Sequence, residues 1–155
     1  MLKVGQPAPE FTASNQLGVT LNLRDFQNQW LILYFYPKDN TPGCTTEAID
    51  FTNQLAQFKS LNAQVVGISP DSIDSHAKFM NKHNLAITLL SDPEHQIAEQ
   101  YGVWQLKKFM GKEYMGIVRS TLIIDPDGKI AYIWSNVRIK NHINNVLVEL
   151  KQLQN

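Results

Sequence analysis

The single cysteine of the chain, Cys44, lies where its chemistry can be enhanced. An apolar run at 30–36 predicts a buried strand, and a helical pattern of apolar residues follows it. Thr41 is a candidate N-cap and Pro42 suits the first helical position, so Cys44 falls in the first helical turn. Free N–H groups and the positive end of the helix dipole favour the thiolate there, which is the nucleophilic form.

This placement leaves two interpretations of Cys44 open. It is in phase with the apolar face of the predicted helix, so its sulfur should lie in a sheltered pocket. A sheltered thiolate would be a catalytic nucleophile, whereas a free cysteine in such a position can also be a small buried hydrophobe. Thr41 is similarly ambiguous, because its hydroxyl could reach the same space or simply cap the helix.

The residues around Cys44 form a recognisable pattern. Pro37, Thr41 and Cys44 make the motif Pro-x-x-x-Thr-x-x-Cys, which resembles the active-site signature of peroxiredoxins. The longer segment 36–45 is similar to the peroxiredoxin Q, or bacterioferritin-comigratory, subgroup. The resemblance continues at 67–69, 89–92, 101–104, 109–112, 116–121 and 124–130. It therefore covers almost the whole chain in one order.

The resemblance implies a thiol-dependent peroxidase acting on hydrogen peroxide and small organic hydroperoxides. Cys44 would attack the peroxide, and Thr41 would orient the attack by hydrogen bonding. Arg119 matches the family's active-site arginine, whose charged fork of donors could hold the sulfur and the peroxide together; from its position alone it would be a solvated arginine at a strand end. Pro37 would close one wall of the pocket, and Gly43 keeps the backbone uncrowded.

Two further residues are candidates for the pocket. Glu47 lies one turn after Cys44, and the resemblance assigns it to anchoring the loop or the arginine network. Its own charge would oppose a thiolate, so we interpret it as structural support. Trp104 is a candidate anchor of the pocket or of a loop, and packing is a more natural role for it than catalysis.

The sequence departs from much of the subgroup at residue 49. Many relatives carry a resolving cysteine five residues after the first, whereas this chain has Ile49 and no second cysteine. A sulfenic acid on Cys44 would therefore need an external thiol: glutathione, a glutaredoxin, a thioredoxin or a second copy of the protein. The missing thiol also exposes Cys44 to over-oxidation. The reaction implied requires no metal, haem or nicotinamide cofactor.

Other functions fit the sequence less well. The four histidines are scattered without metal-ligand spacing, and His76 and His83, seven residues apart, suggest a polar helix face. A thioredoxin-like thiol–disulfide exchanger would need a Cys-x-x-Cys pair. The non-enzymatic alternative is a thioredoxin-like binding or chaperone module in which Cys44 is structural.

Composition limits the setting of the protein. The 155 residues suit one domain, 1–155, and the formal net charge is zero. Balanced charge argues against nucleic acid as a partner, and no stretch approaches a membrane span. One cysteine and the lack of an apolar signal core favour the reducing cytoplasm. The subgroup resemblance favours a monomer, with a dimer possible.

The order of predicted elements indicates an α/β fold. Two short strands within 1–22 should form a hairpin. Further strands are expected at 30–36, 64–69 and 87–90, with a second hairpin from 119–124 and 129–134 around a clear turn signal. Helices are expected from Cys44 to about 61, around 73–80, at 97–101 and at 143–153. Residues 103–116 read as a long connection that either closes over the site or packs its aromatic residues on the surface. The order is compatible with a thioredoxin-like mixed sheet flanked by helices, with an N-terminal β-hairpin extension, which is the fold that the resemblance implies.

Overall fold

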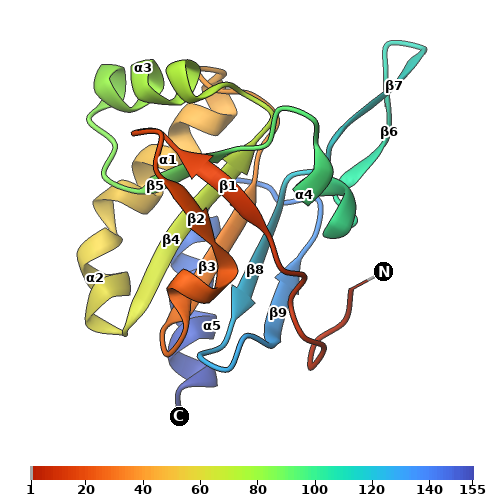
Figure 1. The fold of residues 1–155 in the computed structure, drawn as a ribbon. Coiled ribbons are helices and arrows are strands. Elements are labelled where there is room, and N and C mark those ends of the chain that lie inside the picture. Colours follow the sequence, from red (N-terminus) through yellow and green to blue (C-terminus); the bar gives the residue numbers. More distant parts are fainter. Residues whose placement is uncertain (1) are drawn as a thin grey trace.

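The computed structural model describes residues 2–155 and contains a seven-stranded mixed sheet with strand order β2-β1-β5-β4-β3-β8-β9 (Figure 1). The strands of this sheet are β1 (Thr12–Asn15), β2 (Thr20–Asn22), β3 (Trp30–Phe35), β4 (Ala63–Ser69), β5 (Thr88–Ser91), β8 (Ser120–Ile124) and β9 (Ile130–Trp134). The helices are η1 (Leu23–Phe26), α1 (Pro42–Asn53), α2 (Leu55–Ser60), α3 (Ile73–His83), α4 (Gln96–Gln100) and α5 (His142–Leu153). A separate two-stranded sheet consists of β6 (Trp104–Phe109) and β7 (Lys112–Ile117).

Strand β3 is central because apolar residues cover both of its faces. It runs parallel to β4 and antiparallel to β8. Ile32 and Tyr34 join one core cluster with side chains of α1, α2, α3 and α5, while Leu33 and Phe35 join a second cluster with α4 and the N-terminal segment. Burial on both faces explains why the sequence of β3 is continuously apolar rather than alternating. The predicted thioredoxin-like mixed sheet is confirmed.

The N-terminal hairpin extends this sheet as predicted. Strand β1 pairs antiparallel with β2 on one side and with β5 on the other. The second predicted hairpin is also present, since β8 pairs antiparallel with β9. Its turn is fixed by Asp125, whose carboxylate accepts hydrogen bonds from the backbone N–H groups of Asp127 and Lys129.

Three expectations about the helices and loops were wrong. The helix predicted to run to about 61 is divided at Gln54, whose backbone (φ −103°, ψ 4°) separates α1 from α2. Residues 103–116 are not an irregular connection, because they form the β6–β7 hairpin, which projects from the body of the molecule in Figure 1. The polar helix face inferred from the histidines is wrong for His76, which is fully buried.

Most of the large apolar side chains of the β6–β7 hairpin are exposed. Phe109 and Tyr114 are 66% and 46% exposed, whereas Trp104 stacks on His95, so the alternative that this segment packs its aromatic residues on the surface holds for Trp104 alone. The tip is a tight turn in which both Met110 and Gly111 have positive φ. None of the helices within residues 2–155 is long and apolar enough to cross a membrane.

Candidate active site

Cys44 lies in the first turn of α1, just beyond the end of β3, and only 2% of the residue is exposed. As predicted, Thr41 is the N-cap and Pro42 the first helical residue. Two side chains approach Gly43 closely. A Cβ atom at Gly43 would lie 3.1 Å from the Cδ1 atom of Ile139 and 3.4 Å from the Nη2 atom of Arg119. A side chain here would therefore require the end of the Ile139 side chain to shift by a few tenths of an ångström.

Arg119, between β7 and β8, reaches the cysteine across the end of the sheet. Its Nη2 atom donates a hydrogen bond to the Cys44 sulfur at 3.3 Å, and its Nη1 atom donates to the Glu47 carboxylate at 2.5 Å. The backbone N–H of Val137 donates to the Arg119 carbonyl at 2.9 Å, which holds the backbone of the arginine. The structure thus brings together three residues that the sequence separates by up to 75 positions.

Burial and charge act together on this group. Burial of Glu47 raises the pKa of its carboxyl to about 7, although the nearby Arg119 charge counteracts part of the increase. Burial opposes the charge of Arg119, but Glu47 and Cys44 outweigh that effect and raise its pKa. Arg119 therefore stays cationic beside the sulfur, where it stabilises negative charge on Cys44.

The remaining predicted site residues have more varied surroundings. The Thr41 hydroxyl donates to the Lys38 carbonyl at 2.9 Å and makes no capping hydrogen bond, so it stabilises the loop before α1. Pro37 is half-buried directly after β3. Trp104 stacks on His95, with ring centroids 3.8 Å apart and planes within 4°. This contact is packing between the base of the β6–β7 hairpin and α4.

Two residues near the site were missed by sequence reasoning. The Ile139 side chain lies close to Gly43, the residue before Cys44. His142, at the start of α5, is hydrogen-bonded to the Thr121 hydroxyl at 2.8 Å. Burial lowers the pKa of His142 to about 4, and the Arg119 charge adds to the effect. The spacing between Thr121 and His142 carries no signal in the sequence, because their contact depends on how α5 packs beside β8.

Glu47 and His142 predict opposite effects of pH on stability. The folded-state pKa of Glu47 is above its ordinary value of 4.5, so folded molecules bind more protons and the free energy of unfolding falls as pH rises. The folded-state pKa of His142 is below its ordinary 6.5, so unfolded molecules bind more protons and the same quantity increases with pH. Between about pH 5 and 6.5 the two contributions nearly cancel in the natural protein.

Substituting either residue should reveal the pH dependence that the other contributes to the free energy of unfolding. Relative to the natural protein, the free energy of unfolding of Glu47→Gln should increase with pH, by at most about 1.4 kcal/mol per pH unit. That of His142→Gln should decrease with pH by a similar amount. Urea titrations at several pH values measure both slopes, and using the difference from the natural protein removes the contributions of other carboxyl groups. Parallel slopes for all three proteins would contradict the assignment.

The class of protein follows from this geometry. A thioredoxin-like sheet that presents a buried helix-start cysteine to a paired arginine is the arrangement of a peroxiredoxin, a thiol peroxidase with a peroxidatic cysteine. The chain belongs to the AhpC/TSA family, whose model matches residues 4–133. Its single cysteine, Cys44, fits the variant of the Q type that lacks a resolving cysteine.

Individual relatives agree with this assignment over the whole chain. The chain is 47% identical to peroxiredoxin Bcp of Bacillus subtilis over 152 residues, which cover 98% of this chain and 97% of that protein. A crystal structure of a peroxiredoxin Q variant from Xylella fastidiosa superposes with a TM-score of 0.95 at 34% identity, covering 100% of this chain and 99% of that one. The bacterioferritin comigratory protein of Xanthomonas campestris, studied for alkyl peroxide reduction, gives 0.91 at 35% identity, with 97% and 98% covered.

Proposed function

We propose that the protein reduces hydrogen peroxide and small organic hydroperoxides, and that glutathione, a glutaredoxin or a thioredoxin then reduces Cys44. The observation that supports this most directly is the hydrogen bond from Arg119 to the Cys44 sulfur. It places a permanent cation and a directed donor at the atom that attacks the peroxide. The apolar side chain of Ile139 beside Gly43 would suit the alkyl group of an organic hydroperoxide.

In the first half-reaction, the Cys44 thiolate attacks one oxygen of the peroxide. An S–O bond forms, the O–O bond breaks, and the leaving oxygen takes up a proton as water or an alcohol. Sulfur loses two electrons and becomes a sulfenic acid, while the peroxide gains two. Arg119 would stabilise charge on both the sulfur and the leaving oxygen. Thr41 would turn its hydroxyl from Lys38 towards the peroxide, and Pro37 would shield the pocket from water.

In the second half-reaction, the electrons come from outside the chain. One thiol attacks the sulfenic sulfur and releases water, which leaves a mixed disulfide on Cys44. A second thiol then attacks this disulfide and regenerates the Cys44 thiol. We place the protein in the cytoplasm, where such thiols are reduced, and expect it to act as a monomer.

Single-turnover mixing tests the proposal. The reduced protein is mixed with one equivalent of hydrogen peroxide, tryptophan fluorescence is followed, and peptide masses are measured after quenching. We expect a fast second-order phase that ends with one oxygen on Cys44. Glutathione, a glutaredoxin and a thioredoxin are then added separately to the oxidised protein, and the reagent that restores the thiol fastest identifies the reductant.

The contrary outcome is equally clear. If Cys44 reacts with peroxide no faster than a free thiol at the same pH, the protein is not a peroxidase. A binding role with a structural cysteine would then be the better explanation. A response to disulfides rather than to peroxides would indicate a thiol–disulfide exchanger instead.

A further inference from the structure

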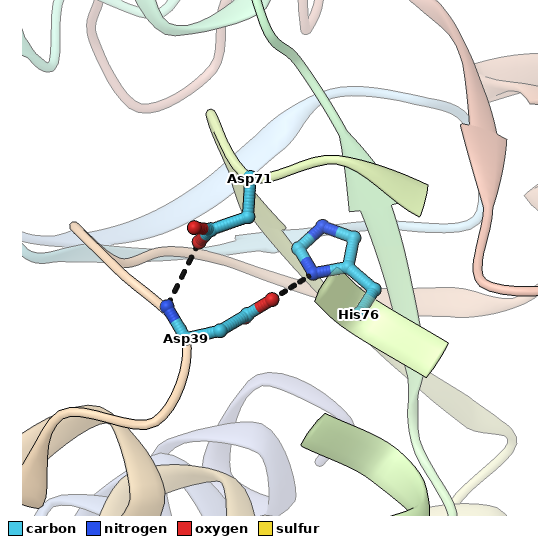
Figure 2. A group of neighbouring side chains, drawn as sticks. All are labelled: Asp39, Asp71 and His76. Atoms are coloured by element: carbon cyan, nitrogen blue, oxygen red, sulfur yellow. Dashed lines mark hydrogen bonds and ion pairs between the residues drawn. The ribbon is translucent and has the colours of Figure 1, made fainter. Parts of the chain in front are cut away.

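A buried cluster of ionisable groups lies beside the loop that leads to Cys44. Figure 2 shows Asp39 from this loop, Asp71 from the segment after β4, and His76 from α3. The Nδ1 atom of His76 lies 2.7 Å from the Oδ2 atom of Asp39, and the backbone N–H of Asp39 donates to the Asp71 carboxylate at 2.8 Å. Asp39 is 6% exposed and His76 is fully buried. The mechanism described above uses none of these groups.

The hydrogen-bond partners of Asp39 and His76 define the charges of this cluster. The Nε2 atom of His76 lies 3.0 Å from the carbonyl oxygen of Leu90, which can only accept, so Nε2 carries a proton. Asp39 receives further hydrogen bonds from the hydroxyl groups of Tyr36 and Ser75, at 2.6 and 2.8 Å. The 2.7 Å contact needs one proton between Oδ2 and Nδ1, and we assign it to His76 because the hydroxyl donors stabilise the carboxylate and imidazole is the stronger base. Asp39 and His76 therefore form a buried ion pair.

The same hydrogen bonds argue against a metal ion at the cluster. The relevant atoms of Asp39, Asp71 and His76 lie within 4.8 Å of one another, which would suit three metal ligands. However, both ring nitrogens of His76 act as donors here, whereas a metal requires a free lone pair. The Oδ2 atom of Asp71 already accepts from the Ser69 hydroxyl as well as from the Asp39 backbone. The cluster is thus complete without a cation.

What the cluster holds is the loop that carries the active site. Asp39 lies five residues before Cys44, and its side chain and backbone N–H are both bound to groups outside the loop. The next residue, Asn40, adopts a left-handed conformation (φ 64°), and its side-chain oxygen lies 3.0 Å from the Nε2 atom of His83, also on α3. Helix α3 therefore fixes two consecutive residues of the loop against the body of the protein.

The two half-reactions make opposite demands on this loop. Attack on peroxide needs Cys44 held beside Arg119, as it is here. Reduction needs a second thiol to approach the sulfur, yet Cys44 is 2% exposed. Outward movement of the start of α1 and of the loop before it would expose the sulfur. Any interaction that holds the loop closed favours the first step and opposes the second.

We propose that the Asp39–His76 ion pair is the latch of the active-site loop, and that it sets the balance between peroxide reduction and thiol access. Asp39 and His76 are positioning residues, since they act on Cys44 through the loop. This inference rests on the proposed peroxidase function and extends it. Because the pair is buried, removing one partner leaves the other charge uncompensated, so a single substitution should open the loop substantially.

The test measures both half-reactions in Asp39→Asn and His76→Gln. The rate constant for hydrogen peroxide should fall about tenfold, while reduction of the sulfenic acid by glutathione should accelerate by about the same factor. Ser75→Ala removes one hydrogen bond to Asp39 from an uncharged donor, so it should shift both rates in the same directions by a smaller factor. Asp74→Asn is the matched control, because Asp74 is an exposed carboxylate on the same helix. It should change neither rate.

A second readout does not require peroxidase activity. Alkylation of Cys44 by iodoacetamide should accelerate in Asp39→Asn and His76→Gln, and backbone amides at 41–45 should exchange hydrogen faster. If peroxide fails to oxidise the natural protein but alkylation is still faster in the two variants, the peroxidase proposal is refuted while the latch proposal is supported. Should either variant slow both half-reactions, or leave alkylation unchanged, the latch proposal is refuted. If both variants misfold, the rates of Ser75→Ala test the latch proposal instead. The side-chain ¹⁵N shifts of His76 in the natural protein then test the ion pair, since a neutral imidazole would refute it.

Discussion

Replacing Cys44 by serine is expected to reduce peroxide consumption to the rate of the buffer alone. The serine hydroxyl can occupy the same space and accept the same hydrogen bond from Arg119. It remains protonated at neutral pH, however, and a neutral hydroxyl is too weak a nucleophile to break the O–O bond. Because Cys44 is the only cysteine, no other thiol can replace it. A coupled assay with excess reductant, or direct peroxide measurement, gives the residual rate.

The control for this experiment concerns methionine. The chain contains four methionines, which peroxide also oxidises, so the intact mass of Cys44→Ser can still increase slowly. Peptide mapping separates this background from oxidation at residue 44. Measurable turnover in Cys44→Ser, after correction for methionine oxidation, would show that the peroxidatic group lies elsewhere.

The second large effect is expected at Arg119. Substitution by alanine removes the donor to the sulfur and leaves Glu47 buried without its partner. The loss of one directed charge-stabilising donor should lower the second-order rate constant for hydrogen peroxide about 10²–10³-fold. Arg119→Lys should retain part of the rate, since a lysine keeps the charge but cannot contact the sulfur and Glu47 through one planar fork. Stopped-flow fluorescence with one equivalent of peroxide measures all three proteins.

Arg24 provides the matched control. Its side chain is 76% exposed and lies 3.9 Å from Glu10 in a surface pair, so Arg24→Ala removes the same charge without touching the site. The rate constant of this variant should equal that of the natural protein. Equal rates for Arg119→Ala and Arg24→Ala would show that Arg119 contributes only packing.

Much of the fold could be predicted because its signals are local. The continuous apolar run of β3 reflects burial on both faces, and Asp125 identifies the turn between β8 and β9 by a hydrogen-bonding pattern within five residues. The β6–β7 hairpin gave no such signal. Its strands face solvent on both sides, so no alternation of apolar and polar residues is required. Its turn uses Met110, a residue that seldom takes positive φ.

The active site also has one part that the sequence predicts and another that it does not. The position of Cys44 follows from the sequence, because Thr41 and Pro42 mark the start of α1 within four residues. Arg119 could be connected to it only through resemblance to a family, since 75 residues separate the two. The role of His76 was not predictable at all. Its partners, Asp39 and the Leu90 carbonyl, meet it only after β3, β5 and α3 have assembled.

The projecting β6–β7 hairpin has a consequence for how such a protein can change over evolutionary time. At its base, the backbone N–H of Val118 donates to the Val103 carbonyl, which closes the hairpin immediately before Arg119. Beyond this closure its tip is exposed, and its strands pair only with each other. Insertions, deletions and substitutions beyond the base therefore leave the sheet and Arg119 in place. The hairpin is a segment that selection can lengthen, shorten or rewrite while the chemistry at Cys44 is conserved.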